Sequence, residues 1–234
     1  MKIHFVSYGN DAYASSKQRI ENEAIQFNKF DSICIYSPKM LSDGFKTTFS
    51  DILSCARGGG YWIWKFDIIL QELDKMDEGD VLVYLDAGCS IVKTGEKRFE
   101  EYIDMLNQSE HNSIGFILTQ KQKEYTTQEI YNALNFEVDD SCQLMGGCQI
   151  YRKNKKLIEM FNEIIDILKK DPYLITDIYN QSQKSFFIDN RHDQSILSIM
   201  RKKYGTLTLP YTEVEPGDVE PEIKKLPFSA TRLR

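Results

Sequence analysis

The run Val81–Leu85 (VLVYL) is the feature of this sequence that most constrains its fold. Five consecutive apolar residues of this kind are typical of a strand that is covered on both faces and lies inside a sheet. Asp86 follows directly, so a carboxylate is expected at the carboxyl end of a central strand, where open α/β sheets bind their ligands. Ala87 and Gly88 come next and leave room for a ligand close to the backbone.

The segments around this run alternate between strand and helix patterns. A strand, a helix and a second strand over residues 2–36 indicate a right-handed βαβ unit and hence a parallel sheet. Further strands are predicted over 113–118 and 205–210, and further helices over 61–76, 97–106 and 157–168. We therefore predict an α/β protein with a mostly parallel central sheet flanked by helices. A length of 234 residues fits one domain, 1–234.

Composition excludes several classes of protein. A net charge of −6 gives no electrostatic footprint for nucleic acid. No apolar run approaches the roughly 20 residues of a membrane span, and the first residues, MKIHFVSYGN, do not form a signal peptide. Five scattered cysteines without a CxxC pair argue against a disulfide framework or a zinc site. We expect a cytoplasmic protein without a transmembrane segment, for which peripheral membrane association stays open.

Two glycine-containing segments are candidates for close contact with a ligand. Arg57 precedes three glycines, which form either a turn between helices or a cradle for phosphate, although the Walker pattern is absent. Gly146 and Gly147 interrupt a strand pattern over 142–151, which indicates a bulge or a nearby ligand. Lys65 lies among aromatic residues of a predicted helix, and if buried it needs an anionic partner, either a structural acid such as Asp67 or a ligand phosphate.

In the segment 186–200 (FFIDNRHDQSILSIM), a short apolar run stops at Asp189 and Asn190, and the apolar residues from Ile196 onward predict a helix. Asn190 is a natural N-cap, which would place Asp193 in the first turn, where the helix dipole favours an acid. His192, Asp193 and Gln194 are expected to converge with Asp86 and the glycine pair. Carboxylate oxygens at such a site suit Mg²⁺ or Mn²⁺.

Taken together, two motifs resemble a known family. The segments 61–65 (YWIWK) and 84–89 (YLDAGC) are similar to those of nucleotide-sugar glycosyltransferases of the GT-A fold. Within these, the chain resembles small bacterial and viral enzymes with YWxWK and YxDxGC motifs, and more distantly the retaining glycosyltransferases of family 8, which carry YLDAD. The resemblance covers nearly the whole chain and implies a GT-A, Rossmann-like single domain.

The resemblance also implies a metal site and a set of donor contacts. Asp86 corresponds to the first acid of the DxD motif, which holds the metal that bridges the donor diphosphate, and Gly88 stands where the second acid is expected. Mn²⁺ or Mg²⁺ is then held by Asp86 and another ligand, or catalysis is independent of metal; Arg232 or Arg234 is a substitute cation. The implied donor-binding residues are Val6, Ser7, Tyr8, Arg19, Arg57, Lys65, Asp86, Ala87, Gly88, Gly146, Gly147 and His192.

The catalytic residues implied by the resemblance are Asp193, Gln194 and Asp86. If Asp193 deprotonates the acceptor hydroxyl, transfer inverts the anomeric configuration. If Asp193 binds sugar hydroxyls and Gln194 faces the anomeric carbon, transfer retains it, as the family 8 resemblance favours. The expected activity is transfer of a hexose from UDP-Gal or UDP-Glc to a saccharide acceptor in surface polysaccharide or glycan synthesis. The alternative is an inactive module that binds a nucleotide sugar or a glycan, which the missing second acid at Gly88 favours.

Overall fold

A computed structural model describes residues 1–214, 225–231 and 233 of the chain. Most of the acidic, proline-containing segment 213–222, for which the sequence suggests an exposed loop, lies outside the described residues, as do Arg232 and Arg234. None of the helices in the described part has both the length and the apolar character needed to cross a bilayer.

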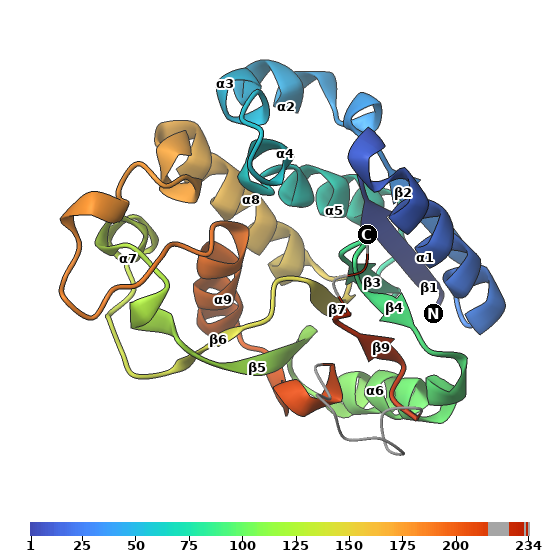
Figure 1. Cartoon of the computed structure of the whole chain (residues 1–234). Helices are drawn as coiled ribbons and strands as arrows, with labels where there is room; N and C mark the ends of the chain where they lie inside the picture. Colours follow the sequence, from blue (N-terminus) through green and yellow to red (C-terminus); the bar gives the residue numbers. More distant parts are fainter. Residues whose placement is uncertain (215–224, 232, 234) are drawn as a thin grey trace.

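A seven-stranded sheet forms the centre of the molecule, with the strand order β2-β1-β3-β7-β5-β6 and with β8 beside β5 (Figure 1). Strands β1, β2, β3, β5 and β8 run in one direction, while β7 and β6 run against them. The predicted, mostly parallel α/β sheet is therefore confirmed. The strands are β1 (Ile3–Tyr8), β2 (Ser32–Tyr36), β3 (Val81–Leu85), β5 (Ser113–Lys121), β6 (Cys142–Leu144), β7 (Cys148–Arg152) and β8 (Leu207–Pro210).

Helices cover both faces of this sheet (Figure 1). The longer helices are α1 (Ala14–Phe27), α5 (Trp64–Lys75), α6 (Glu96–Gln108), α8 (Lys155–Lys170) and α9 (Asp193–Tyr204). The shorter helices are α2 (Asp43–Thr48), α3 (Ser50–Leu53), α4 (Gly58–Tyr61) and α7 (Gln128–Leu134).

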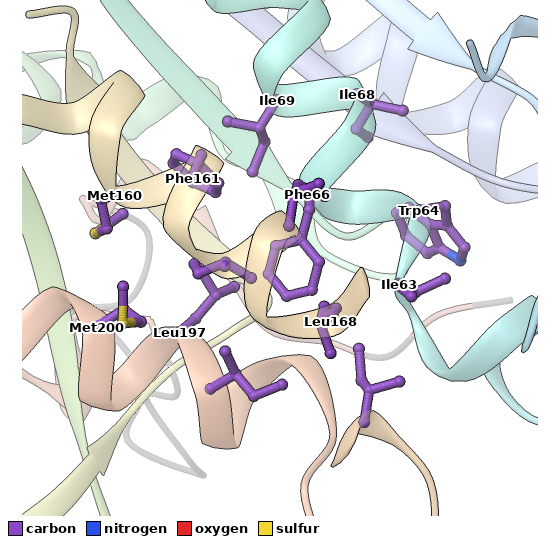
Figure 2. Close-up of a cluster of buried hydrophobic side chains, with 14 of the residues drawn as sticks. Ile63, Trp64, Phe66, Ile68, Ile69, Met160, Phe161, Leu168, Leu197 and Met200 are labelled. Carbon is purple, nitrogen blue, oxygen red and sulfur yellow. The ribbon is translucent and has the colours of Figure 1, made fainter. Parts of the chain in front are cut away.

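The core consists of two layers because side chains of a strand alternate between the faces of its sheet. Leu82 and Tyr84 of β3 face the layer that contains α5, α8 and α9. The other three β3 residues face the layer that contains α1 and α6. All five are completely buried, as the apolar run predicts for a central strand. Figure 2 shows the first layer, where Phe66, Phe161 and Leu197 meet.

The chain between α3 and α5 turns in a left-handed sense. Five consecutive residues, Gly58 to Trp62, have φ angles of +60°, +58°, +98°, +52° and +61°. Glycine adopts this region without a steric penalty, whereas a side chain there costs about 1–2 kcal/mol. This cost applies to Tyr61 and Trp62. Both of their rings pack against His192, with centroid separations of 5.1 and 5.4 Å. The glycine run thus forms a turn between helices, and contact of this run with a phosphate stays a prediction.

The carboxyl-terminal segment returns to the loop that follows β3. A two-stranded sheet joins β4 (Ser90–Ile91) to β9 (Phe228–Ser229). Beyond it, the Leu233 amide and the Thr231 hydroxyl donate hydrogen bonds, each of 3.0 Å, to the Gly88 carbonyl. The position at which a second acid is expected is therefore occupied by backbone that binds the end of the chain.

Candidate active site

A cleft of about 890 Å³ opens at the edge of the sheet where β1, β3 and β5 end. Because β7 runs against these strands, its amino end lies at the same edge, and Leu85 pairs with Cys148. The described residues that line the cleft come from all four strand ends, from the segments 56–64 and 191–194, and from Ala230 and Leu233. They include Tyr8, Asn10, Tyr13, Gly59, Trp62, Trp64, Asp86, Gly88, Leu118, Gln120, Gly147, Arg191, Gln194 and Leu233.

Asp86 and Gly147 face each other across the junction of β3 and β7. The Asp86 amide donates a 2.9 Å hydrogen bond to the Gly147 carbonyl. A β-carbon at position 147 would lie 2.8 Å from Asp86 Oδ2, so a side chain there would displace the carboxylate. The predicted meeting of Asp86 with the glycine pair is present, and Gly147 is required because the carboxylate occupies the space of a side chain.

Lys65 lies directly beneath the junction of β3 and β7, and it is wholly buried between two carboxylates. Its ammonium binds Asp193 Oδ2 in a very short contact, lies 3.4 Å from Asp86 Oδ1 and donates a 2.9 Å hydrogen bond to the Gly146 carbonyl. It also lies 4.9 Å from the centre of the Tyr84 ring. The anionic partner that the sequence required is thus supplied by Asp193 and Asp86; Asp67 instead accepts hydrogen bonds from the amide and hydroxyl of Ser42.

Burial and charge determine the protonation of this group. Burial lowers the pKa of Lys65, but Asp193 and Asp86 raise it by more, so the net shift is upward and the amine stays protonated. Burial raises the pKa of Asp193 to about 6, with Lys65 opposing and Asp86 adding to the rise. Burial and Asp86 raise the pKa of Tyr84, which therefore remains a phenol and donates a 2.5 Å hydrogen bond to Asp86 Oδ1.

Gln194 is fixed by both ends of its amide. Its Oε1 accepts a 3.0 Å hydrogen bond from the Gly146 amide, and its Nε2 donates a 2.7 Å hydrogen bond to Gln143 Oε1. Gln143 is completely buried and in turn donates to the carbonyl of Tyr125. Gln194 therefore presents a rigid amide to the cleft, in a position set by the backbone of the glycine pair.

Aromatic rings form the opposite end of the cleft. Tyr8, at the end of β1, stacks on Trp64 with a centroid separation of 3.7 Å, and the Trp64 indole donates a 3.0 Å hydrogen bond to the Gly58 carbonyl. Burial raises the pKa of Tyr8 to about 12, so its hydroxyl is neutral. Both rings are at least 94% covered, and each contributes a small apolar, aromatic surface to the cleft lining, of a kind that suits a planar ring of a ligand.

Several residues predicted to contact a donor lie away from the cleft wall. Val6 and Ser7 are completely buried, and the Ser7 hydroxyl donates to the Leu85 carbonyl. Arg19 binds the loop after β3 from behind, donating hydrogen bonds of 2.8 and 2.9 Å to the carbonyls of Ala87 and Cys89. These three residues support the loop around Asp86, and the structure shows no surface of Val6 or Ser7 that could contact a ligand.

Arg57 and His192 likewise have structural partners. Arg57 donates a 2.8 Å hydrogen bond to Asp177. His192 is buried, its Nδ1 donates to the Ile175 carbonyl at 2.9 Å, and burial lowers its pKa. His192, with φ +58°, occupies the N-cap position of α9 without a capping hydrogen bond from its side chain. The predicted cap, Asn190, instead donates to the carbonyls of Leu174 and Thr176. The prediction of Asn190 as the N-cap is therefore wrong.

The residues present allow a divalent cation only with help from a ligand. Among the described residues, no group of three or more His, Cys, Asp or Glu side chains is placed to hold a metal ion. Asp86 is the carboxylate that reaches the cleft, with its side chain 39% exposed. Mg²⁺ is commonly bound by one or two carboxylates together with substrate phosphates and water, and Asp86 can provide that single anchor.

Sequence reasoning missed several residues of the cleft. Trp64 lies next to Lys65 in the predicted helix and is 95% covered, yet it reaches the cleft. Gln120 could have been found, because it stands near the end of a strand that runs parallel to β3. Arg191 had no local pattern to mark it.

The sheet and its two helical layers have the fold of the GT-A glycosyltransferases. The structure is similar to a glycosyltransferase involved in the glycosylation of the major capsid of PBCV-1, with a TM-score of 0.53 and 11% identity over 98% of this chain and 92% of the other. It is similar to mouse xyloside xylosyltransferase 1, with a TM-score of 0.50 and 10% identity over 100% and 95% of the two chains. No protein-family model and no curated protein sequence matches the chain. At these identities the likeness establishes the fold.

Proposed function

We propose that the protein is a glycosyltransferase that moves a hexose from a nucleoside-diphosphate sugar, UDP-Gal or UDP-Glc, to a saccharide acceptor in surface polysaccharide or glycan synthesis. The observation that carries the proposal is the meeting of Asp86, Lys65, Asp193 and Gln194 at the edge of a GT-A sheet. The aromatic wall of Tyr8 and Trp64 takes the base of the donor. The sugar then lies toward Gly147 and Gln194.

The donor diphosphate is expected beside Asp86 and Gly88. We propose that Mn²⁺ or Mg²⁺ is held there by Asp86 together with phosphate oxygens and water, and that it supplies positive charge at the leaving group. Lys65, which is 2% exposed, does not reach the cleft wall in this structure. Its role is to balance the negative charges of Asp86 and Asp193 and to hold both carboxylates in place.

The charges of the cleft favour transfer with retention. An inverting reaction needs a side chain that accepts the proton of the attacking hydroxyl. Among the described residues, Asp86 is the carboxylate that lines the cleft, and it is engaged by Tyr84 and Lys65; Asp193 lies beneath, paired with Lys65. In the retaining reaction, the bond from the anomeric carbon to the acceptor oxygen forms on the face from which the bond to the diphosphate breaks, and the departing diphosphate takes the hydroxyl proton.

All five cysteines are free, which is consistent with a reducing compartment, and we propose a cytoplasmic location on that basis. Association with a membrane surface would bring the enzyme to a membrane-linked acceptor.

An inactive module that binds a nucleotide sugar or a glycan is the second candidate, supported by Gly88, whose carbonyl is occupied by the end of the chain. Calorimetry with UDP, with and without Mn²⁺, followed by UDP-release assays with a panel of UDP-sugars, separates the two. We expect binding of UDP and slow release of UDP from one of the sugars. Binding with no release, in the presence of acceptors as well as in their absence, would assign the module instead.

A further inference from the structure

Arg191 differs from the other described arginines in the hydrogen bonding of its guanidinium. Five of the arginines that the structure describes donate guanidinium hydrogen bonds to the protein: Arg19, Arg57, Arg98, Arg152 and Arg201. Within the described part of the chain, the Arg191 guanidinium donates none. Its carboxylate neighbour, Asp189, lies 3.6 Å away and is shared with Arg57 at 3.7 Å.

Arg191 is nevertheless held in position. Its backbone amide donates hydrogen bonds to the Tyr125 carbonyl at 3.2 Å and to the Ser195 hydroxyl at 2.9 Å. Its guanidinium carbon lies 5.0 Å from the centre of the Tyr125 ring, a separation typical of cation–π contact. With 47% of its side chain exposed, the group is braced from behind and open to the cleft.

The location of Arg191 separates it from the nucleotide end of the cleft. Tyr8 stands at the end of β1, whereas Tyr125, on which Arg191 rests, follows the end of β5. The strand path β1-β3-β7-β5 has three steps, which amount to about 14 Å at the usual strand spacing. Asp86, and with it the expected diphosphate, lies between these strand ends. Gln120 and Tyr125, which contacts Arg191, are therefore on the side of Asp86 away from Tyr8, where the acceptor is expected.

Among the described residues that line the cleft, Asp86 and Arg191 are the charged ones. A guanidinium presents a planar fork of donors that matches a carboxylate or a phosphate with two parallel hydrogen bonds. We propose that Arg191, supported by Tyr125, binds a carboxylate or phosphate group carried by the saccharide acceptor. The inference rests on the proposed function and deepens it, because it makes the acceptor an acidic saccharide.

Tryptophan fluorescence gives a test that does not depend on turnover, since the chain contains two tryptophans, Trp62 and Trp64, and both line the cleft. The protein is first saturated with UDP, so that the diphosphate site is filled. Glucose, glucuronic acid, glucose 6-phosphate and inorganic phosphate are then titrated separately. Wild-type protein is expected to bind one of the two acidic sugars at least about tenfold more tightly than glucose, the factor for one charge-assisted hydrogen bond. Inorganic phosphate is expected to bind less tightly than glucose 6-phosphate.

Arg191→Gln is expected to erase the preference for the acidic sugar, and Arg191→Lys to retain part of it because the charge remains and the fork is lost. Lys155→Gln is the matched control, since Lys155 is 90% exposed on α8, and it should behave as wild type.

Three results would overturn the inference: equal binding of acidic and neutral sugars by wild-type protein, inorganic phosphate binding as tightly as glucose 6-phosphate, or a loss of UDP affinity in Arg191→Gln with the preference intact. The last result would assign Arg191 to the donor diphosphate. Absence of UDP release from every UDP-sugar bears on the proposed function alone, because the titrations require no turnover.

Discussion

Lys65 and Asp193 form a buried ion pair that joins α5 to α9 under the candidate site. The two residues are 128 positions apart in the chain, and each is at most 8% exposed as a side chain. A buried ion pair is costly to break, because the remaining partner keeps its charge in a medium of low polarity. The packing of the helical layer and the position of the acids at the cleft therefore depend on the same ion pair.

Replacement of Lys65 by Met should leave the negative charges of Asp86 and Asp193 without a positive partner. We expect the free energy of unfolding to fall by about 3–5 kcal/mol, and donor hydrolysis to be lost. Urea denaturation of Lys65→Met, Asp193→Leu and the double variant measures the coupling. The double variant should be more stable than the sum of the single effects predicts; simple additivity would show that the pair does not interact.

The stability of the protein should depend on pH through the protonation of Asp193. Its folded-state pKa, about 6, lies above the ordinary value of 3.8, so the folded protein holds this proton more tightly than the unfolded chain does. The contribution of Asp193 to stability is thus complete below about pH 4 and declines as the pH rises through 6, by about 3 kcal/mol in all.

The measurement is the free energy of unfolding of the wild type minus that of Asp193→Asn, obtained by urea denaturation from pH 4 to pH 7. This difference should fall with rising pH. A difference that rises over the same range would mean that the Lys65 charge dominates and that the pKa of Asp193 is lowered.

Gly147 should tolerate no side chain, for steric reasons. Gly147→Ala places a β-carbon 2.8 Å from Asp86 Oδ2, which forces the carboxylate to move. UDP release should fall at least about tenfold, the effect of about 1.4 kcal/mol on the barrier. Gly44→Ala is the control: it lies in α2 with no atom within 4 Å of the added carbon, and should leave activity unchanged while stabilising the protein by about 0.5–1 kcal/mol. Equal activity of the two variants would contradict the role of Gly147.

The left-handed turn offers a test that separates backbone strain from steric clash. Gly60 and Gly79 have φ angles of +98° and +85°, so alanine is strained at both. At Gly60 the new carbon would also lie 2.8 Å from Leu53 Cα, whereas at Gly79 nothing lies within 4 Å. Thermal unfolding should show a loss of about 1 kcal/mol for Gly79→Ala and a further 1–3 kcal/mol for Gly60→Ala. Equal losses would mean that the turn moves freely to accommodate the side chain.

The sequence predicted the sheet better than the directions of its strands. Val81–Leu85 is recognisable because burial on both faces removes every polar residue from the strand. Nothing in the residues of β6 or β7 specifies that these strands run against β3, because the side-chain pattern of a strand is the same in either direction.

The candidate site was predictable where a strand end or a glycine pair marks it, as for Asp86 and Gly147. The partner of Lys65 was not, because Asp193 is distant in the sequence and the nearer acid, Asp67, faces Ser42. Arg191 was not predictable, because no sequence motif surrounds it. Its proposed role depends on its contact with Tyr125 and on its position in the cleft, and both arise only when the chain folds.

Substitution of Asp86 tests the central claim most directly. Asp86→Ala removes the acid that the cleft presents where we propose that the donor diphosphate binds, while leaving Lys65 paired with Asp193. The fold should therefore survive, as circular dichroism and urea denaturation would show. The assay is release of UDP from the UDP-sugar that the wild-type protein hydrolyses. Loss of release by Asp86→Ala with the fold intact is the predicted result, and release at the wild-type rate would contradict the assignment of this cleft as a glycosyltransferase site.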